Sequence, residues 1–469
     1  MNNFQPGRPV ILQFFHRLVL AILTAHEFEN MKQSILLLCS LLICTLFTAN
    51  AQRGKTGQNI DQLARAIEPK VIAWRRHFHQ YPELSNRETK TAARIADHLR
   101  SLGIDVETGI AHTGVVGVLK GGKPGPVIAL RADMDALPVT ERNSLPFASK
   151  ETTMYNDQEV GVMHACGHDT HMAILMGVAE VLASMKKDLK GTVKFIFQPA
   201  EEGAPQGEEG GAELMVKEGV LQNPKADVIF GLHISSQTEL GKITYRPGGL
   251  MASVNDMKIT VKGRQAHGAA PWSSVDPIVV AAQIITNLQT IVSRNLEVTE
   301  NAGVVTIGSI HGGVRSNIIP EQVEMLGTLR ALSVEDEKMI VSRVRQIATS
   351  VAEAHGATAE VQIPYSSHYP VTFNNIALTQ KMVPSLNKAA GEENVHVIAP
   401  HTGAEDFSFF QEKIPGLFFF VGACPPGMDP KKAPSHHTPD FMIDEKAMLT
   451  GLKAMLQLTL DYAEIGVKD

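Results

Sequence analysis

The spacing of hydrophobic residues along the chain changes from one segment to the next. Some segments repeat apolar residues every three or four positions, as helices with a buried face do. Others are short continuous apolar runs, which are typical of buried strands. Their alternation predicts an α/β domain with a mostly parallel, mixed sheet and helices on both faces. The helices are expected at residues 60–83, 87–103 and 170–189, and the strands at 126–138, 191–203 and 226–234.

A different order begins near residue 250. Helical and alternating patterns follow one another as strand, helix, strand, strand, helix, strand. This is the βαββαβ, ferredoxin-like arrangement. Patterns of the first kind resume after it. We therefore expect one domain in two parts, residues 55–248 and 365–469, interrupted by a lid domain at residues 249–364.

The N-terminal segment predicts a targeting signal. Residues 31–51 read MKQSILLLCSLLICTLFTANA, with one lysine, an apolar run and a small-residue cleavage site before Gln52. The apolar run of roughly 14 residues is shorter than the ~20 that a membrane span needs, which disfavours an uncleaved anchor. We expect export to the periplasm or the medium, with no stable membrane span after cleavage. Residues 1–30 precede the signal, so Met31 is the expected true start.

Composition narrows the possible partners. The 469 residues carry a formal charge of −6, without the basic character of nucleic-acid-binding proteins, so nucleic acid is not expected as a partner. Once the signal is removed, Cys166 and Cys424 are the remaining cysteines. Two unmatched cysteines do not make the disulfide scaffold of a small exported protein. The cysteine within HACGHD therefore needs another explanation.

Metal-ligating side chains gather where the predicted strands end. In an open parallel sheet, ligands bind beyond the carboxyl ends of the strands. The segment MHACGHDTHMA, residues 163–173, opens a predicted helix there, with Asp169 or Thr170 expected as its N-cap. Thiolate, imidazole and carboxylate together are ligands of zinc and other transition metals. The strand-end residues are Asp133, Asp135, Glu201, Glu202 and His233.

Two pairs among these candidate residues, one in the segment 163–173 and one at a strand end, suggest metal-assisted hydrolysis. Cys166 and His168 are two positions apart in a glycine-containing turn, close enough to share one metal ion or to flank two. The adjacent side chains of Glu201 and Glu202 diverge, so one can bind metal while the other acts as a general base for water. Taken singly, such residues fit a buried thiol or a solvated turn equally well. Their convergence at one sheet edge favours the metal site.

Other chemistries fit the sequence less well. A nucleophilic cysteine with a histidine base is one alternative, but such partners are usually distant in sequence. The chain contains no HExxH or GxSxG motif. The segment GVLKGGKP, residues 117–124, lacks the Ser or Thr that a phosphate-binding P-loop requires.

Nine motifs occur in an order that resembles a known family. They are RRHFHQYPELSNRETKTA, LRADMDALP, MHACGHDTHMA, FQPAEEG, GLH, GRQAHGAAPW, GGVRSNIIP, GAEDFSFF and HHTPDFMIDE. From Ile60 to the C terminus the chain resembles the metallo-amidohydrolases of aminoacylase and carboxypeptidase-G type. Within these it is most similar to hippurate hydrolase and to plant auxin-amino-acid conjugate hydrolases. The resemblance implies a di-metal exopeptidase-like domain with an inserted dimerisation lid.

The resemblance also implies roles for individual residues. Two divalent metal ions are expected, with Zn, Mn, Co and Ni all open, and Glu201 matches the general base. The last expected ligand is His437, which directly precedes TPDF, and His436 is the competing choice. The implied ligands are Cys166, His168, Glu202, His233 and His437.

The lid contributes further residues by the same resemblance. His267 of GRQAHGAAPW is expected to reach the active site of the other subunit of a homodimer and to stabilise the oxyanion there. Asn317 and Arg315 of GGVRSNIIP are expected to hold the substrate carboxylate, although a surface charge explains Arg315 equally well.

One departure from the wider family concerns the end of the first strand. Other branches have an HxD strand end, and this chain has Arg131 to Asp133 in its place. Cys166 is therefore expected to replace a missing ligand, and Asp133 or Asp135 to orient a ligand from behind.

We predict an exported enzyme that hydrolyses the amide bond of N-acyl amino acids or small peptide-like conjugates. A metal-activated water attacks, and a glutamate is the general base. A dipeptidase or aminopeptidase on the same scaffold is the alternative enzyme, and a binding protein that has lost catalysis is the alternative outside enzymes. The acyl group and the amino acid stay open.

Overall fold

The computed structural model describes residues 60–297, 299 and 301–466. The predicted signal segment 31–51 and residues 1–30 before it lie outside this part of the chain. Within the described part, no helix is both long and apolar enough to cross a membrane. Residues 60–80 are helical. The helix ends just before Pro82, because proline disfavours the helical conformation in the residue that precedes it.

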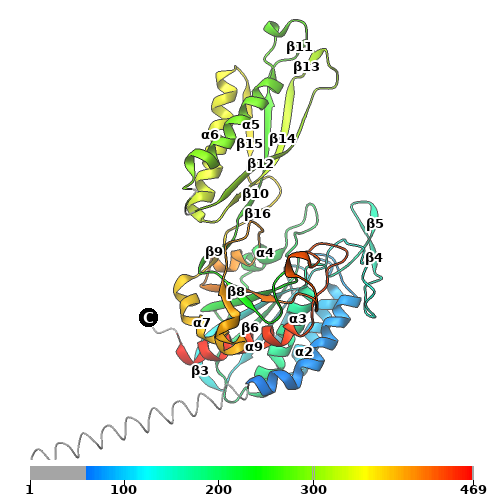
Figure 1. The fold of residues 1–469 in the computed structure, drawn as a ribbon, viewed down its shortest axis with the longest axis vertical. Coiled ribbons are helices and arrows are strands. Elements are labelled where there is room, and N and C mark those ends of the chain that lie inside the picture. The colour runs from blue at the N-terminus through cyan, green and yellow to red at the C-terminus, as the bar shows by residue number, and fades with distance from the viewer. Residues whose placement is uncertain (1–59, 298, 300, 467–469) are drawn as a thin grey trace, which may run out of the picture. The chain divides into compact units, whose positions relative to one another are not determined.

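The first domain is built on a mixed sheet of eight strands (Figure 1). The four central strands are parallel, and their outer neighbours on both sides pair with them antiparallel, while the last strand on one edge is again parallel to its neighbour. This confirms the predicted fold class. In spatial order the strands are β1 (Asp105–Ile110), β2 (Gly114–Lys120), β6 (Lys190–Gln198), β3 (Lys123–Asp133), β7 (Val228–Ser235), β19 (Gly416–Gly422), β8 (Ile243–Tyr245) and β18 (Val395–Val397).

Helices cover both faces of this sheet, as predicted. Phe230 of β7 contacts Tyr462 of the last helix, whereas its neighbour Ile229 belongs to a core cluster with Met215 on the opposite face. The first face carries α3 (His168–Ser184) and α9 (Ala447–Ile465), and the second carries α4 (Gly211–Lys217) and α8 (Ser408–Gln411). Two further helices, α2 (Thr89–Ser101) and α7 (Ile376–Ala390), pack beside α3 and α9.

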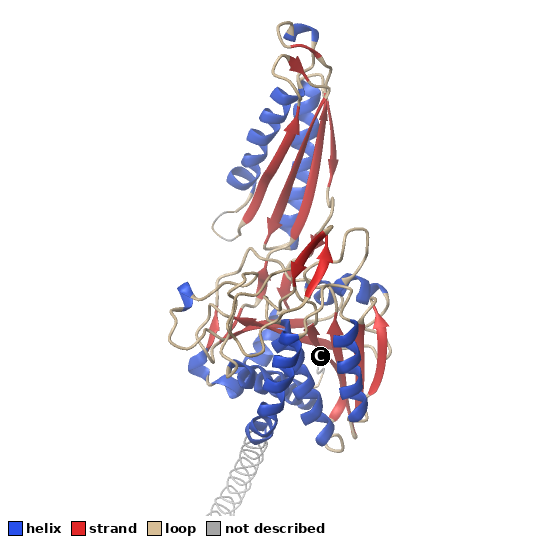
Figure 2. Cartoon of the chain, turned by 90° about the vertical axis from the view of Figure 1, so that its right-hand side faces the viewer, coloured by secondary structure: helices blue, strands red, loops and turns tan. Residues whose placement is uncertain are grey.

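The inserted lid has the predicted βαββαβ order. Its elements are β10 (Val254–Lys262), α5 (Pro277–Asn295), β12 (Gly303–Gly312), β14 (Gln322–Ala331), α6 (Val334–Ala354) and β15 (Thr358–Gln362). The antiparallel sheet has the order β12-β14-β10-β15, and β16 (His368–Tyr369) extends it along β10. Both helices pack on one face (Figure 2). The exact domain boundaries stay a prediction.

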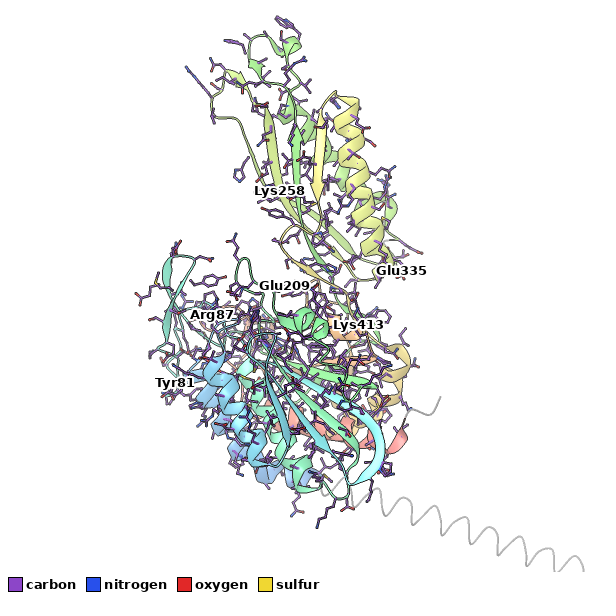
Figure 3. The ribbon with its side chains drawn as sticks, turned by 180° about the vertical axis from the view of Figure 1, so that it is seen from behind. Tyr81, Arg87, Glu209, Lys258, Glu335 and Lys413 are labelled. Atoms are coloured by element: carbon purple, nitrogen blue, oxygen red, sulfur yellow. The ribbon has the colours of Figure 1, made fainter. Side chains whose placement is uncertain are left out.

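Alternation along β10 explains why one lid face is covered and the other open. Met257, Ile259 and Val261 are buried in the lid core. Lys258 lies between them on the opposite face, where its amine pairs with Glu324 at 2.5 Å (Figure 3).

Short elements complete the fold. The hairpin β4 (Thr152–Tyr155) and β5 (Gln158–Gly161) projects from the first domain. The pair β9 (Gly248–Met251) and β17 (Thr372–Asn374) lies where the chain enters and leaves the lid. The pair β11 (Ala266–His267) and β13 (Ile318–Ile319) belongs to the lid. The 3-10 turns are η1 (Pro271–Ser273), η2 (Glu392–Asn394) and η3 (Pro430–Lys432).

Candidate active site

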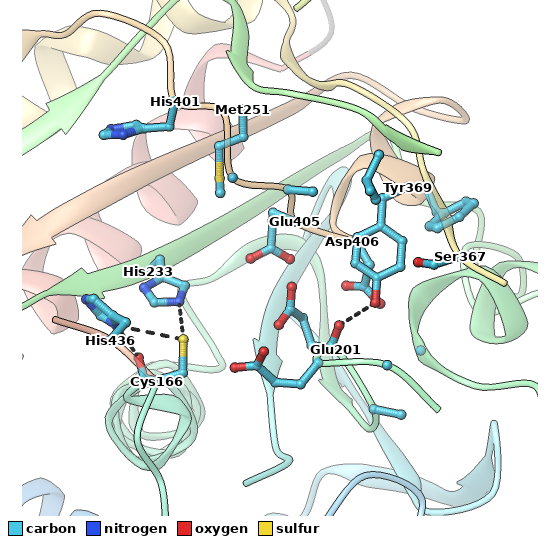
Figure 4. A pocket seen from close by; sticks show the side chains of 18 of the residues that line it. Cys166, Glu201, His233, Met251, Ser367, Tyr369, His401, Glu405, Asp406 and His436 are labelled. Carbon is cyan, nitrogen blue, oxygen red and sulfur yellow. Dashed lines mark hydrogen bonds between the residues drawn. The ribbon is translucent and has the colours of Figure 1, made fainter. Parts of the chain in front are cut away.

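The parallel strands bring the predicted residues to one edge of the sheet. Asp133 is the last residue of β3, the pair Glu201–Glu202 follows β6, and His233 lies near the end of β7. His168 begins α3 at the same edge. Except for Asp133 and His168, which lie behind them, these residues line a cavity of about 1230 Å³ (Figure 4).

The five predicted metal ligands form one continuous row. The Cys166 Sγ lies 3.4 Å from His233 Nε2 and 3.2 Å from His437 Nε2. His437 Nε2 lies 3.1 Å from Glu202 Oε1, and that oxygen lies 3.8 Å from His168 Nε2. The thiol therefore lies between the imidazoles of His233 and His437 in this row.

The environment of His168 fits a bound cation. Its Nδ1 donates a hydrogen bond to the Asp135 carbonyl oxygen at 2.8 Å, which leaves the Nε2 lone pair directed into the site. This buried Nε2 has no hydrogen-bond partner among the described residues. Burial by itself would lower the pKa of His168, but the carboxylates of Asp133 and Asp135 raise it to about 10. A metal ion would replace that proton and satisfy the nitrogen.

The structure separates the two adjacent histidines near the C terminus. His436 contacts the Cys166 carbonyl oxygen through Nδ1 at 3.1 Å and accepts from the Ser236 backbone N–H through Nε2 at 3.4 Å. Both of its ring nitrogens are thus engaged. His437 adopts a left-handed backbone (φ 62°), held by its N–H bond to the Ala165 carbonyl at 2.8 Å. This geometry favours His437 as the ligand.

The thiol environment favours a metal ligand over a nucleophile. Burial raises the pKa of Cys166 well above its usual value, and the carboxylates of Glu202 and Glu201 raise it further. Reactive cysteines have depressed pKa values and lie near positive charge. A transition metal supplies the charge that deprotonates such a thiol.

A glycine makes the turn between Cys166 and His168 possible. Gly167 has φ 99°, and a Cβ there would lie 2.3 Å from Ile234 Cγ2. Gly167 is also the N-cap of α3, so the prediction of Asp169 or Thr170 as the cap was wrong. Asp169 lies inside the helix, and its carboxylate forms a buried ion pair with Arg75 at 2.7 Å.

Glu201 is a buried carboxyl group beside other carboxylates. It follows Ala200, whose backbone is left-handed (φ 53°), and the residue is 7% exposed. Burial raises the pKa of Glu201 well above its usual range, and the nearby carboxylates of Glu405 and Glu202 add to this effect. A carboxylate with a raised pKa is suited to accept and release a proton near neutral pH.

A buried network supports the ligands from behind. Asp133 contacts His171 Nδ1 through one oxygen at 2.6 Å and accepts from Arg131 through the other at 2.7 Å. His171 Nε2 accepts from the Ile234 N–H at 2.8 Å. Asp133 and His171 thus tie the strands together around the site. The sequence analysis expected Asp133 or Asp135 to orient a ligand, and of the two it is Asp135 that holds the candidate ligand His168 through Nδ1.

Arg131 extends the network to a loop that the sequence analysis left without a role. Its guanidinium lies 2.9 Å from both Glu405 and Asp406 of the GAEDF segment. Gln198 also donates to Asp406. In the sequence, Glu405 and Asp406 were visible only as part of the GAEDFSFF motif, and nothing there showed that they face Glu201.

Arg330 is a second residue that the sequence analysis missed. It lies on β14 of the lid, is half-buried and lines the cavity. Its guanidinium makes no hydrogen bond or ion pair with any described residue. The one feature of the sequence that could have pointed to Arg330 is that it is a single charged residue in an otherwise uncharged strand segment, GTLRAL.

The three predicted lid residues do not line this cavity. His267 is on β11 and pairs with Ile318 of β13, and the Gly268 N–H donates to the Asn317 carbonyl at 2.8 Å. Arg315 lies in the same exposed loop. The structure thus brings His267, Asn317 and Arg315 together, apart from the metal-ligating row.

Comparison with known proteins places the chain in a family. The model of "Peptidase family M20/M25/M40" matches residues 129–461. The chain belongs to this family. "Putative amidohydrolase YhaA" of Bacillus subtilis is 39% identical over 395 residues, which are 84% of this chain and 95% of the relative.

Two further relatives indicate the chemistry of the family. "N-acetylcysteine deacetylase" of Bacillus subtilis is 39% identical over 407 residues, covering 85% of this chain and 98% of the relative. The crystal structure of Bacillus subtilis YXEP, described as a dinuclear metal binding peptidase, is 34% identical with a TM-score of 0.70 and covers 85% of this chain and 99% of that one. This chain is accordingly a hydrolase that acts on amide bonds.

Proposed function

We propose that this protein hydrolyses the amide bond of N-acyl amino acids or small peptide-like conjugates, using two divalent metal ions. The row of five metal-ligating side chains beside a buried glutamate carries this proposal. Relatives named as a deacetylase of an acyl amino acid and as a dinuclear metal binding peptidase support it.

The metal ions would be held by the row described above. Cys166 would be flanked by His233 and His437, and Glu202 and His168 continue the row beyond His437. When bound, the ions lower the pKa of water and polarise the scissile carbonyl. The thiol and imidazoles are compatible with Zn, Mn, Co or Ni.

Glu201 would act as the general base and then as the general acid. It accepts a proton from the attacking water and passes it to the leaving amine. Tyr369 donates its hydroxyl hydrogen to the Glu201 backbone carbonyl at 2.7 Å, which holds the turn in place. The buried Glu405 and Asp406 surround the same carboxyl group.

The free guanidinium of Arg330 is the proposed site for the substrate carboxylate. It faces the cavity from the lid and offers two parallel N–H donors, the arrangement that carboxylates accept.

The proposal also includes a homodimer in which His267, Asn317 and Arg315 act on the partner's site. Export through residues 31–51 is part of it, checked by N-terminal sequencing, with Gln52 expected first.

A substrate panel tests the proposed function. Protein starting at Gln52 is assayed on N-benzoyl and N-acetyl amino acids and on dipeptides with a free amino group. Each assay is repeated with chelator and with Mn, Zn, Co or Ni restored. We expect hydrolysis of acyl amino acids that chelator abolishes and metal restores. Preference for a free amino group would select the dipeptidase or aminopeptidase alternative, and chelator-resistant activity lost on thiol alkylation would make Cys166 the nucleophile.

A further inference from the structure

Glu88 is a buried carboxyl group that the proposed mechanism leaves without a role. It is fully buried and is the N-cap residue of α2, yet its side chain forms no capping hydrogen bond with this helix, which lies wholly within the described part of the chain. Glu83 caps the helix instead, since its carboxylate accepts from the backbone N–H groups of Lys90 and Thr91 at 2.9 Å. The helix therefore does not depend on the Glu88 side chain.

The Glu88 side chain reaches the turn that carries Glu201. One of its oxygens accepts from the Ala200 backbone N–H at 3.0 Å, and the other accepts from the Thr113 hydroxyl at 2.5 Å. Ala200 has a left-handed backbone (φ 53°), which a residue other than glycine keeps only where its surroundings impose it. The hydrogen bond from Ala200 to Glu88 helps to impose this conformation, because it fixes the N–H group of the strained residue.

Two further hydrogen bonds hold the backbone of the same turn. Tyr369 donates to the Glu201 carbonyl at 2.7 Å (Figure 4), and the Asp135 carboxylate accepts from the Glu202 N–H at 3.0 Å. The turn is thus held at three consecutive residues, and Glu88 holds the first of them. A shift of that first residue would move the Cα atom of Glu201, and its carboxyl group would move with it.

The residue two positions before Glu88 contacts the same loop farther along. Asn86 donates to the Glu208 carboxylate at 3.1 Å and to the Glu209 carbonyl at 3.0 Å. The segment that leads into α2 therefore supports the loop 200–209 at both of its ends. Glu88 is the member of that segment that bonds next to the proposed general base.

We propose that Glu88 is a positioning residue, which holds the general base Glu201 in the orientation that proton transfer requires. Glu88 lies behind the cavity and not in its lining, so it acts through the Ala200 backbone and not on the substrate. Catalysis is sensitive to such support, since a misplacement of about 1 Å can cost roughly 100-fold in rate. This inference rests on the proposed function, because it takes Glu201 as the base.

Two conservative substitutions separate the reach of this side chain from its charge. Glu88→Asp keeps the carboxyl group but is one methylene shorter, so it cannot span from Ala200 to Thr113. Glu88→Gln keeps the length, because its carbonyl oxygen can accept from Ala200 while its amide donates to the Thr113 hydroxyl oxygen. A neutral amide also suits the site, because burial and the Asp135 carboxylate raise the pKa of Glu88 to about 8.

The test measures kcat, KM and metal content per chain for the metal-loaded protein on an N-acyl amino acid. We expect Glu88→Asp to lower kcat by about 10- to 100-fold and to leave KM nearly unchanged. Its metal content should match the wild type, because the Glu202 N–H keeps its bond to Asp135. Glu88→Gln should keep kcat close to that of the wild type.

Asp461→Ala is the matched control for a general loss of stability. The Asp461 carboxylate accepts from Ser385 and Lys388 at 2.7 Å each, between α7 and α9, and it does not line the cavity. This variant also loses two hydrogen bonds of a carboxylate, so it should lower Tm and leave kcat unchanged. An equal fall of kcat in Asp461→Ala and Glu88→Asp would mean that the loss reflects stability, and the inference would be wrong.

Three other results would overturn the inference. An unchanged kcat in Glu88→Asp would show that the reach of the side chain is unimportant. An equally low kcat in Glu88→Gln would show that the charge matters instead. A loss of metal in proportion to the loss of kcat would show that Glu88 supports the ligand Glu202 and not the base.

Thr113→Val provides a second variant if Glu88→Asp does not fold. It removes the hydroxyl group that orients the Glu88 carboxyl group and leaves Glu88 itself in place. It should lower kcat without changing KM or metal content, and an unchanged kcat would contradict the inference.

Failure of the inference differs from failure of the proposed function. Wild-type protein that hydrolyses no N-acyl amino acid with any metal would contradict the proposed function, and the inference would fall with it. An active wild type together with any of the contradicting results above would overturn the inference alone.

Discussion

Replacing Glu201 by glutamine tests the central step of the proposed mechanism. The two side chains have the same shape, so the substitution removes the basic oxygen and leaves the packing unchanged. The Tyr369 hydrogen bond also survives, because it goes to the backbone carbonyl of residue 201. The variant should therefore fold and bind metal as the wild type does.

The expected loss of activity follows from the role of a general base. Such a group contributes about 10²- to 10⁴-fold to the rate, which corresponds to about 3–5 kcal/mol of transition-state stabilisation. The thermal stability of the variant, unlike its activity, should not fall. A Glu201 oxygen lies within 4.8 Å of carboxylate oxygens of Glu405 and Asp406. Each repulsion at that distance is on the order of 3 kcal/mol at an effective dielectric constant of about 20, and Arg131 offsets part of it.

Three measurements on Glu201→Gln separate the possible outcomes. kcat/KM on an N-acyl amino acid should fall by the stated factor, metal content per chain should not change, and Tm should stay equal or rise. Turnover near that of the wild type would refute the assignment of Glu201 as the base. A parallel loss of metal and Tm would show that Glu201 is a ligand or a structural group.

Three other predictions test different parts of the molecule. Cys166→Ser should reduce the metal content measured by elemental analysis below that of the wild type, because serine is a poor ligand for a soft ion; full metal content with lost activity would favour a nucleophilic cysteine. Arg330→Gln should raise KM for an acyl amino acid roughly 10- to 100-fold and leave the corresponding amide, which lacks the carboxylate, unaffected; equal changes on both would exclude carboxylate binding. Burial lowers the pKa of Lys194, whose amine donates to the Val220 carbonyl at 2.7 Å, to about 8 from 10.5. The unfolded chain therefore keeps this proton to higher pH than the folded protein, and stability should rise between pH 8 and 10.5 in the wild type relative to Lys194→Met. Denaturant unfolding at several pH values checks this, and identical pH profiles would contradict it.

Several of the candidate ligands could be placed at one edge of the sheet from the sequence because strand ends are local features. A run such as VIFGLH shows both a buried strand and the residue at its end, and parallel strands share one direction. His233 and the Glu201–Glu202 pair follow from this rule alone. The βαββαβ order of the lid was predictable for the same reason, since each element has its own periodicity.

The choice between His436 and His437 depended on the backbone. Adjacent residues have the same local sequence context, and the resemblance favoured His437 without a physical reason. The left-handed conformation at His437 turns its imidazole toward Glu202 and Cys166. His436 Nδ1 also lies 3.7 Å from the Cys166 sulfur, but both of its ring nitrogens contact backbone groups. Long-range contacts impose these conformations, so a sequence pattern does not reveal them.

The sequence by itself determined the main helices and strands and the type of chemistry, because these depend on periodicity and on residue type at strand ends. Tertiary structure alone decided which other residues share the cavity. Arg330 comes from the inserted lid, whereas Phe420 of β19 and Glu405 of a loop after β18 come from the part of the chain that returns to the sheet after the insertion. Substrate selectivity rests on such contacts between distant segments, which no local pattern encodes.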